Sequence, residues 1–185
     1  MLLDIGFLDD ATRPTVPKLE GVTPRQRVAG EHLREIHDHL RANMQAIRGL
    51  IERAAAGLES PEAVAEETAQ LLMVENFRRF GNLCGRYCQV VNTHHSIEDA
   101  HLFPALAAQS EGYARVTERL AAEHVVVHTL LERQIEALIA LAEAPGPAAF
   151  ATAREIYEAL ERVLLSHLGY EEEQIGDALG YFGVM

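Results

Sequence analysis

Histidines and glutamates recur one helical turn apart on the apolar stripes of this chain. Four separate helical segments carry them: His37; His94 with Glu98; His124 with His128; and His167 with Glu171. Residues four apart on a helix point the same way. A metal ion held between helices needs such pairs, because each helix offers ligands only from its inward face. The sequence therefore predicts five imidazoles and two carboxylates around one interior point, enough for two iron ions.

The composition limits the kinds of partner. A chain of 185 residues suits one domain with a sizeable core. Its net charge of −12 argues against nucleic acid and against an anionic membrane surface. The apolar N-terminus lacks the basic residues that open a signal peptide, and no apolar run reaches the length of a membrane span. We expect a soluble, cytoplasmic protein, and the sequence names no protein partner.

Helical periodicity and its interruptions divide the chain. We expect an irregular segment over residues 1–24, a helical domain over 25–178 and a short tail over 179–185. The helices are expected over residues 25–56, 61–109, 111–143 and 148–178. The pattern leaves open whether the second is one long helix or two, and Pro104 predicts a kink or an end near it. Without strand-like alternation, the fold class is all-α, an up-down-up-down four-helix bundle.

Helix phase, at about 100° per residue, sorts the candidate ligands further. It puts His95 on the flank of its helix, about 100° from His94. It puts His101 nearly one turn beyond Glu98 on the inward stripe. On the last helix, Glu171 lies only about 40° from His167, whereas Glu172 lies about 140° away. The phase therefore favours Glu171 as the second carboxylate ligand.

The chemistry of these side chains favours particular metals. Burying two carboxylates is costly unless a cation compensates their charge. A structural zinc ion takes four ligands, usually with thiolates among them, and calcium and magnesium take oxygen. Five nitrogens and two carboxylates instead suit two octahedral first-row ions, with iron as the leading choice. Helical bundle cores are known hosts for such sites.

Three motifs resemble the hemerythrin-like (HHE cation-binding) family: CGRYCQVVNTHHSIEDAHLFPAL, EHVVVH and SHLGYEEE. The resemblance covers about residues 26–176. It implies an oxo- or hydroxo-bridged di-iron centre with one iron on His124, His128 and His167. The second iron would bind His37 and His94 and keep an open position, and Glu98 would bridge the two. The second bridge is Glu171 in the pattern of many relatives, and Glu172 at the spacing of the oxygen carriers.

The resemblance implies a non-haem di-iron protein that binds or reduces a small oxidant: dioxygen, peroxide or nitric oxide. Tyr87, His101 and Tyr157 lie on inward stripes, and Tyr87 and His101 are the candidate catalytic proton donors. Such donors favour consumption of peroxide over reversible binding of oxygen. The alternative is a non-catalytic iron or oxygen sensor, or an iron-storage module.

Overall fold

Helices make up the regular secondary structure of the part of the chain that the structure describes. The structure is a computed structural model, and it describes residues 4–55, 60, 86–144 and 146–184. Within these ranges there is no strand, which confirms the all-α prediction. The up-down-up-down order of a four-helix bundle stays a prediction.

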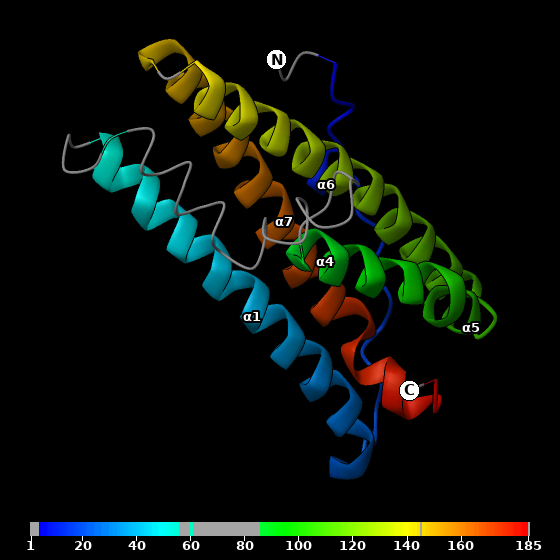
Figure 1. The fold of residues 1–185 in the computed structure, drawn as a ribbon. Coiled ribbons are helices and arrows are strands. Elements are labelled where there is room, and N and C mark those ends of the chain that lie inside the picture. Colours follow the sequence, from blue (N-terminus) through cyan, green and yellow to red (C-terminus); the bar gives the residue numbers. More distant parts are fainter. Residues whose placement is uncertain (1–3, 56–59, 61–85, 145, 185) are drawn as a thin grey trace. The chain divides into compact units, whose positions relative to one another are not determined.

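Three helices of more than thirty residues and one interrupted helix follow one another along the chain (Figure 1). The elements are η1 (Asp10–Thr12), α1 (Pro24–Ala55), α4 (Arg86–Ile97), η2 (Glu98–Leu102), α5 (Phe103–Ala107), α6 (Glu111–Glu143) and α7 (Pro147–Tyr181). The bounds of α6 are those predicted, and α1 differs by one residue at each end. Helix α7 continues three residues into the expected tail. The predicted helical stretch over residues 61–85 lies outside the described residues.

Side-chain caps explain where two of the long helices begin. At the start of α1, the backbone N–H of Gln26 donates to Thr23 Oγ1, and the backbone N–H of Thr23 donates to Gln26 Oε1. This reciprocal pair is a capping box, and Pro24 occupies the first helical position, where no N–H is needed. At α6, Ser110 Oγ accepts from the N–H of Tyr113. The cap satisfies an N–H that would otherwise lack a partner.

A π-helix interrupts the second helical stretch directly before Pro104. The N–H of Phe103 donates to the carbonyl of Glu98, five residues earlier. Pro104 has no N–H to donate, which makes a regular helical register costly at this point. The wide turn adds a residue to the repeat, so the inward side chain after Glu98 is Phe103 and not His101.

The described residues form two compact units. Of the described residues, unit 1 contains 4–5, 42–55, 60, 86–93, 127–144 and 146–163, and unit 2 contains 6–41, 94–126 and 164–184. Unit 1 has an apolar cluster of α6 and α7 residues: Ala137, Leu141, Ala153 and Ile156. Unit 2 has a larger cluster that includes Leu33 of α1, Leu106 of α5, Leu120 of α6 and Ile175 of α7. The residues of α1, α6 and α7 are thus divided between the two units.

Glycines allow α1 and α7 to approach closely within unit 2. A Cβ atom on Gly30 would lie 2.5 Å from the carbonyl oxygen of Gly176, closer than packed atoms allow. A Cβ on Gly180 would likewise overlap the carbonyl of Gln26. Both contacts therefore require a residue without a side chain. They hold the backbone of α7 against the helix that carries His37.

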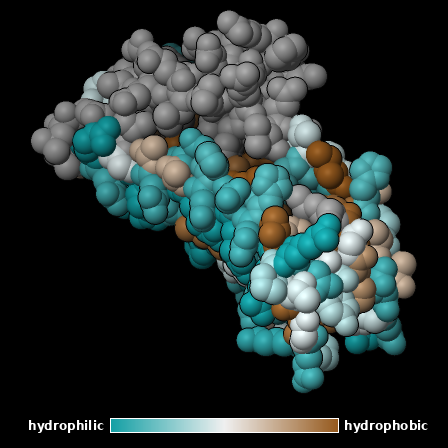
Figure 2. Space-filling view, turned by 90° about the horizontal axis from the view of Figure 1, so that it is seen from below, coloured by the Kyte–Doolittle hydropathy of each residue, from teal (hydrophilic) through white to brown (hydrophobic). Residues whose placement is uncertain are grey.

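Polar residues predominate on one face of the described part of the chain (Figure 2). Figure 2 shows a largely hydrophilic face on which apolar residues are scattered. None of the described helices combines the length and the apolar character that a membrane span requires.

Candidate metal centre

Seven side chains bring metal-ligating atoms together within unit 2. In each of two groups the ligand atoms lie within 4.8 Å of one another: His37, His94, Glu98 and Glu171; and His95, His124 and His167. These residues come from α1, α4, η2, α6 and α7. Helices from distant parts of the sequence therefore contribute to one site, as the spacing of the ligands predicts.

Glu98 faces one histidine of each group. Its Oε1 lies 3.2 Å from His94 Nε2, and its Oε2 lies 3.7 Å from His124 Nε2. Ligand atoms bound to one octahedral ion at about 2.1 Å lie about 3 Å apart. The observed separations are close to this spacing, so small side-chain adjustments would bring these atoms onto ions.

Glu171 likewise faces one histidine of each group. Its Oε2 lies 3.5 Å from His37 Nε2 and 3.5 Å from His167 Nε2. His37 Nε2 also lies 3.2 Å from His94 Nε2. Each carboxylate therefore has one histidine from each group beside it.

Both carboxylates are buried without a basic partner. Glu98 is 1% exposed and Glu171 is fully buried, and none of their four oxygens accepts a hydrogen bond from a described N–H or hydroxyl group. Burial raises the pKa of both, and the negative charge of Glu171 raises that of Glu98 further. A buried carboxylate costs several kcal/mol, about as much as folding can tolerate, unless charge compensates it.

The histidines present lone pairs to the same space. Burial lowers the pKa of His37 and of His94 to about 3, so both rings are neutral at physiological pH. The Nε2 atoms of His124 and His167 are buried and have no hydrogen-bond partner among the described residues. Neutral imidazole is the form that binds metal.

Three of the histidines carry a carboxylate on the opposite ring nitrogen. The contacts join His37 Nδ1 to Glu172 Oε1 at 2.8 Å, His124 Nδ1 to Asp99 Oδ1 at 3.0 Å, and His167 Nδ1 to Glu123 Oε2 at 3.1 Å. A carboxylate there fixes the proton on Nδ1 and leaves Nε2 as the lone-pair nitrogen. Metal-binding histidines commonly have such a partner.

Glu123 is the most strongly held of these outer carboxylates. Burial alone would raise its pKa, but hydrogen bonds from His167, Arg13 and Arg119 outweigh burial and lower it to about 2. Arg41 similarly donates to Glu172 at 2.7 Å. Glu123 is therefore an anion at any physiological pH.

Six of the seven predicted ligands come together, and one does not. His37, His94, Glu98, His124, His167 and Glu171 belong to the two groups. His128 is half-buried, belongs to unit 1 and is in neither group. Glu172 lies outside both groups and contacts the far side of the His37 ring, so the carboxylate that helix phase favours is the one inside the site.

His95 is the member of the site that the sequence analysis placed elsewhere. It is 1% exposed, and its ring stacks on that of His124 with centroids 3.7 Å apart and planes 5° from parallel. The expectation of a flanking position was wrong because an inward helical face is at least about 100° wide. A residue about 100° from His94 therefore still lies on the edge of that face, and its proximity in sequence was the available signal.

Of the predicted proton donors, the structure describes the side chains of His101 and Tyr157. His101 is exposed, so its expected place on the inward stripe was wrong, and the π-helix is the physical reason. The side chain of Tyr87 lies outside the described residues. Tyr157 is buried in unit 1, where its hydroxyl lies 2.5 Å from the carbonyl oxygen of Met44. Burial raises the pKa of Tyr157 to about 12.

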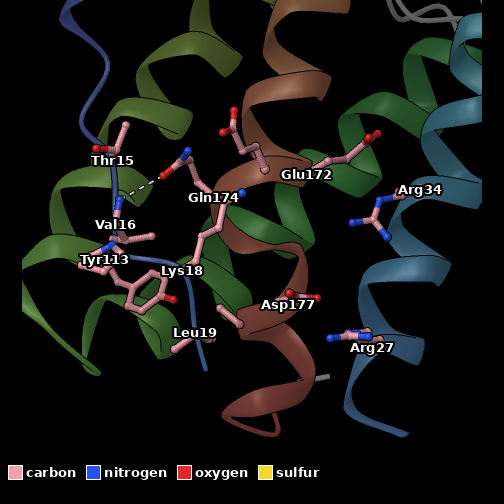
Figure 3. Close-up of a pocket in the computed structure, with 13 residues that line it drawn as sticks. Thr15, Val16, Lys18, Leu19, Arg27, Arg34, Tyr113, Glu172, Gln174 and Asp177 are labelled. Atoms are coloured by element: carbon pink, nitrogen blue, oxygen red, sulfur yellow. Dashed lines mark hydrogen bonds between the residues drawn. The ribbon is translucent and has the colours of Figure 1, made fainter. Parts of the chain in front are cut away.

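A cavity of about 500 Å³ lies beside Glu172 within unit 2. Residues 15–19 of the N-terminal segment form one part of its wall, and side chains of α1 and α7 form others (Figure 3). Gln174 of α7 accepts a hydrogen bond from the N–H of Val16 there, 3.0 Å away. Glu172 therefore lines this cavity and also contacts the outer face of the His37 ring.

The comparisons with known proteins identify the family. The model of the hemerythrin HHE cation binding domain matches residues 28–179. The match covers most of the chain, which therefore belongs to this family of cation-binding proteins. Neither the curated proteins nor the solved structures yield a match.

The donor set fits the metal binding that the family name implies. Carboxylates without basic partners, neutral imidazoles and outer carboxylates on Nδ1 are what metal ligands require. The chemistry of the two groups of His and Glu residues is therefore compatible with the cation binding of the family.

Proposed function

We propose that the two groups bind two iron ions in a bridged di-iron centre. The observation that carries this proposal is the pair of buried carboxylates, Glu98 and Glu171, each between two imidazoles and without a basic partner. Two divalent cations would compensate this charge. Mixed imidazole and carboxylate ligands suit first-row metals, and oxygen-only sites for calcium or magnesium are excluded by the histidines.

The geometry supports a nearly symmetric assignment. His37 and His94 would hold one ion, and His124 and His167 the other, with Glu98 and Glu171 between them. This arrangement differs from the family-based expectation in one respect: His95, and not His128, is the further nitrogen beside the second ion.

We propose further that the site binds or reduces a small oxidant, which is dioxygen, peroxide or nitric oxide. Iron would supply a redox centre and a Lewis acid for such a molecule. Burial keeps His37 and His94 neutral, and the carboxylates on Nδ1 of His37, His124 and His167 leave the Nε2 atoms of these three rings available to an ion. Glu172 contacts His37 and also lines the cavity, so it is the candidate group for carrying protons between the two.

Metal stoichiometry tests the centre. After anaerobic reconstitution with Fe(II), elemental analysis should find two irons per chain. Two adjacent residues give a matched pair of variants: Glu171→Gln should lose at least one iron, whereas Glu172→Gln should retain both with an affinity lower by about 10–100-fold. One tightly bound zinc ion, or no metal, would contradict the di-iron proposal.

A second matched pair tests the revised ligand. His95→Gln should weaken retention of one iron, because His95 lies in the group with His124 and His167. His128→Gln should leave both irons in place. The opposite result would restore the ligand set that the family resemblance implies.

The reaction has its own test. Protein loaded with two Fe(II) ions should reduce one equivalent of peroxide to water, because the two ions supply the two electrons, and the Glu98→Gln variant, deprived of its metal, should not. Reversible oxygen uptake without any peroxide consumption, measured with an oxygen electrode, would favour a carrier over a reductase.

A further inference from the structure

Residues 9–16 of the N-terminal segment are attached to α6 and α7 within unit 2. The carbonyl of Pro14 accepts from the hydroxyl of Tyr170 at 2.6 Å, and the carbonyl of Asp9 accepts from Arg119 at 2.9 Å. Thr12 Oγ1 accepts a second bond from Arg119 at 2.8 Å. These contacts fix residues 9–16 against α6 and α7, although the segment contains no long helix of its own.

Arg13 extends from this segment to a buried carboxylate. Its Nε donates to Glu123 Oε1 at 2.8 Å, and its Nη2 donates to Glu123 Oε2 at 2.9 Å. Its Nη1 donates to Ser166 Oγ at 2.8 Å, and the guanidinium carbon lies 4.7 Å from the centre of the Tyr170 ring. The two parallel bonds to Glu123 fix the orientation of that carboxylate, which a point charge would not do.

Glu123 in turn contacts the metal centre. Its Oε2, which accepts from Arg13, also lies 3.1 Å from His167 Nδ1. The opposite nitrogen of the same ring, Nε2, lies 3.5 Å from Glu171 Oε2 inside the site. A chain of direct contacts therefore runs from Arg13 through Glu123 and His167 to the carboxylate between the two groups.

The three outer carboxylates differ in how they are held. Glu123 binds two guanidinium groups, those of Arg13 and Arg119. Glu172 binds the guanidinium of Arg41, on the same helix as His37. Asp99, the partner of His124, is 44% exposed and has no arginine partner among the described residues. The N-terminal segment is thus a support for one histidine in particular.

We propose that the N-terminal segment, through Arg13, positions a ligand of the metal centre. Arg13 is a positioning residue that orients Glu123, which fixes the ring of His167 and so controls how tightly the ion on His124 and His167 is retained. This inference rests on the proposed two-metal function. The ion on His37 and His94 is supported separately, through Glu172 and Arg41.

Release of Co(II), a coloured probe, can separate the two supports. Protein loaded with two equivalents is mixed with excess chelator, and the loss of each equivalent is followed by its visible absorption. Arg13→Gln should speed the release of one equivalent by about 10–100-fold and leave the other unchanged. Arg41→Gln should instead speed the release of the other equivalent. Arg115→Gln, which removes an exposed pair with Glu111, should change neither.

Two further variants separate positioning from general stability. Arg13→Lys keeps the charge but not the two parallel bonds, so its release rate should lie between those of wild type and Arg13→Gln. In a Glu123→Gln background, Arg13→Gln should add no further effect. Arg13→Gln should also lower the melting temperature of the loaded protein more than that of the metal-free protein.

Three results would overturn the inference. They are equal acceleration of both equivalents, an undiminished Arg13→Gln effect in the Glu123→Gln background, and equal losses of melting temperature with and without metal. A wild type that binds fewer than two equivalents would instead contradict the proposed function itself, so the two failures are distinguishable.

Discussion

Unit 1 and unit 2 each bury glutamates, and they treat them differently. In unit 1, Glu161 is 5% exposed and forms an ion pair with Arg48, whose Nε donates to it at 2.8 Å. The hydroxyl of Tyr157 lies 3.1 Å from the same carboxylate. In unit 2, Glu98 and Glu171 are more deeply buried, and no arginine or hydroxyl group of the described residues forms a hydrogen bond with them.

The presence or absence of these partners distinguishes a carboxylate with a structural role from one that is suited to bind a cation. A buried charge that has its own counter-ion is complete within the chain, whereas an uncompensated pair must either retain protons or bind a cation. Unit 2 does contain arginines near the site, yet they bind the outer carboxylates and not these two. The stability of unit 2 should therefore depend on metal, whereas the contribution of the Glu161–Arg48 ion pair to unit 1 should not.

Removing the metal should have the largest effect. Each ion present at about 1,000 times its dissociation constant stabilises the folded state by about 4 kcal/mol, so two ions contribute about 8 kcal/mol. For a chain of this size, that corresponds to roughly 15–30 °C in melting temperature. Calorimetry of loaded and chelator-treated protein measures it. Equal melting temperatures would show that unit 2 needs no cation.

Neutralising the carboxylates should have opposite effects in the two units. In metal-free protein at pH 8, Glu98→Gln with Glu171→Gln removes uncompensated charge and should raise the stability by about 3 kcal/mol. Glu161→Gln breaks a satisfied pair and should lower it by about 2–3 kcal/mol, a figure reduced because Arg48 is half-exposed. Urea unfolding of both variants measures the signs, and a loss of stability in both would remove the distinction.

Glu98 and Glu171 should also determine how the stability of the metal-free protein depends on pH. Their pKa values are raised by burial, so the folded state keeps protons that the unfolded state releases, and stability falls as pH rises above their ordinary range. His37 and His94, with pKa values lowered to about 3, oppose this trend only up to their unfolded pKa of about 6.5.

Between pH 6.5 and 8, Glu98 and Glu171 are the described groups whose raised pKa values still affect stability, and the metal-free protein should lose about 2 kcal/mol over this range. The double variant Glu98→Gln with Glu171→Gln should lose clearly less over the same range. An identical slope in the variant would assign the pH dependence to other groups.

Sequence periodicity was sufficient for much of the site because regular helices obey it. The bounds of α6, the inward position of His37, and the choice of Glu171 over Glu172 all follow from a repeat of 3.6 residues. These residues lie in uninterrupted helices, where each position has a fixed direction.

Periodicity failed where the backbone departs from that repeat or where contacts cross between distant segments. The π-helix at Glu98–Leu102 turned His101 outward, and Pro104 predicted an interruption near this point but not which side chains it would turn. The contact of Arg13 with Glu123 spans 110 residues, and an irregular segment has no phase from which to predict it. Their residue type made the outer carboxylates candidates for contacts with the histidines, but only the structure shows which histidine each one contacts.

His101 should have the smallest effect, and it tests the role of the π-helix. The sequence suggested an inward proton donor one turn from Glu98, whereas the structure exposes its side chain. His101→Ala should therefore leave the iron content unchanged and alter the free energy of unfolding by less than about 0.5 kcal/mol, as surface substitutions do. Peroxide consumption by the loaded variant should equal that of wild type, because an exposed imidazole can be replaced by solvent. Slower turnover at full iron content would show that His101 supplies protons after all, and loss of iron would show that the π-helix opens to admit it to the site.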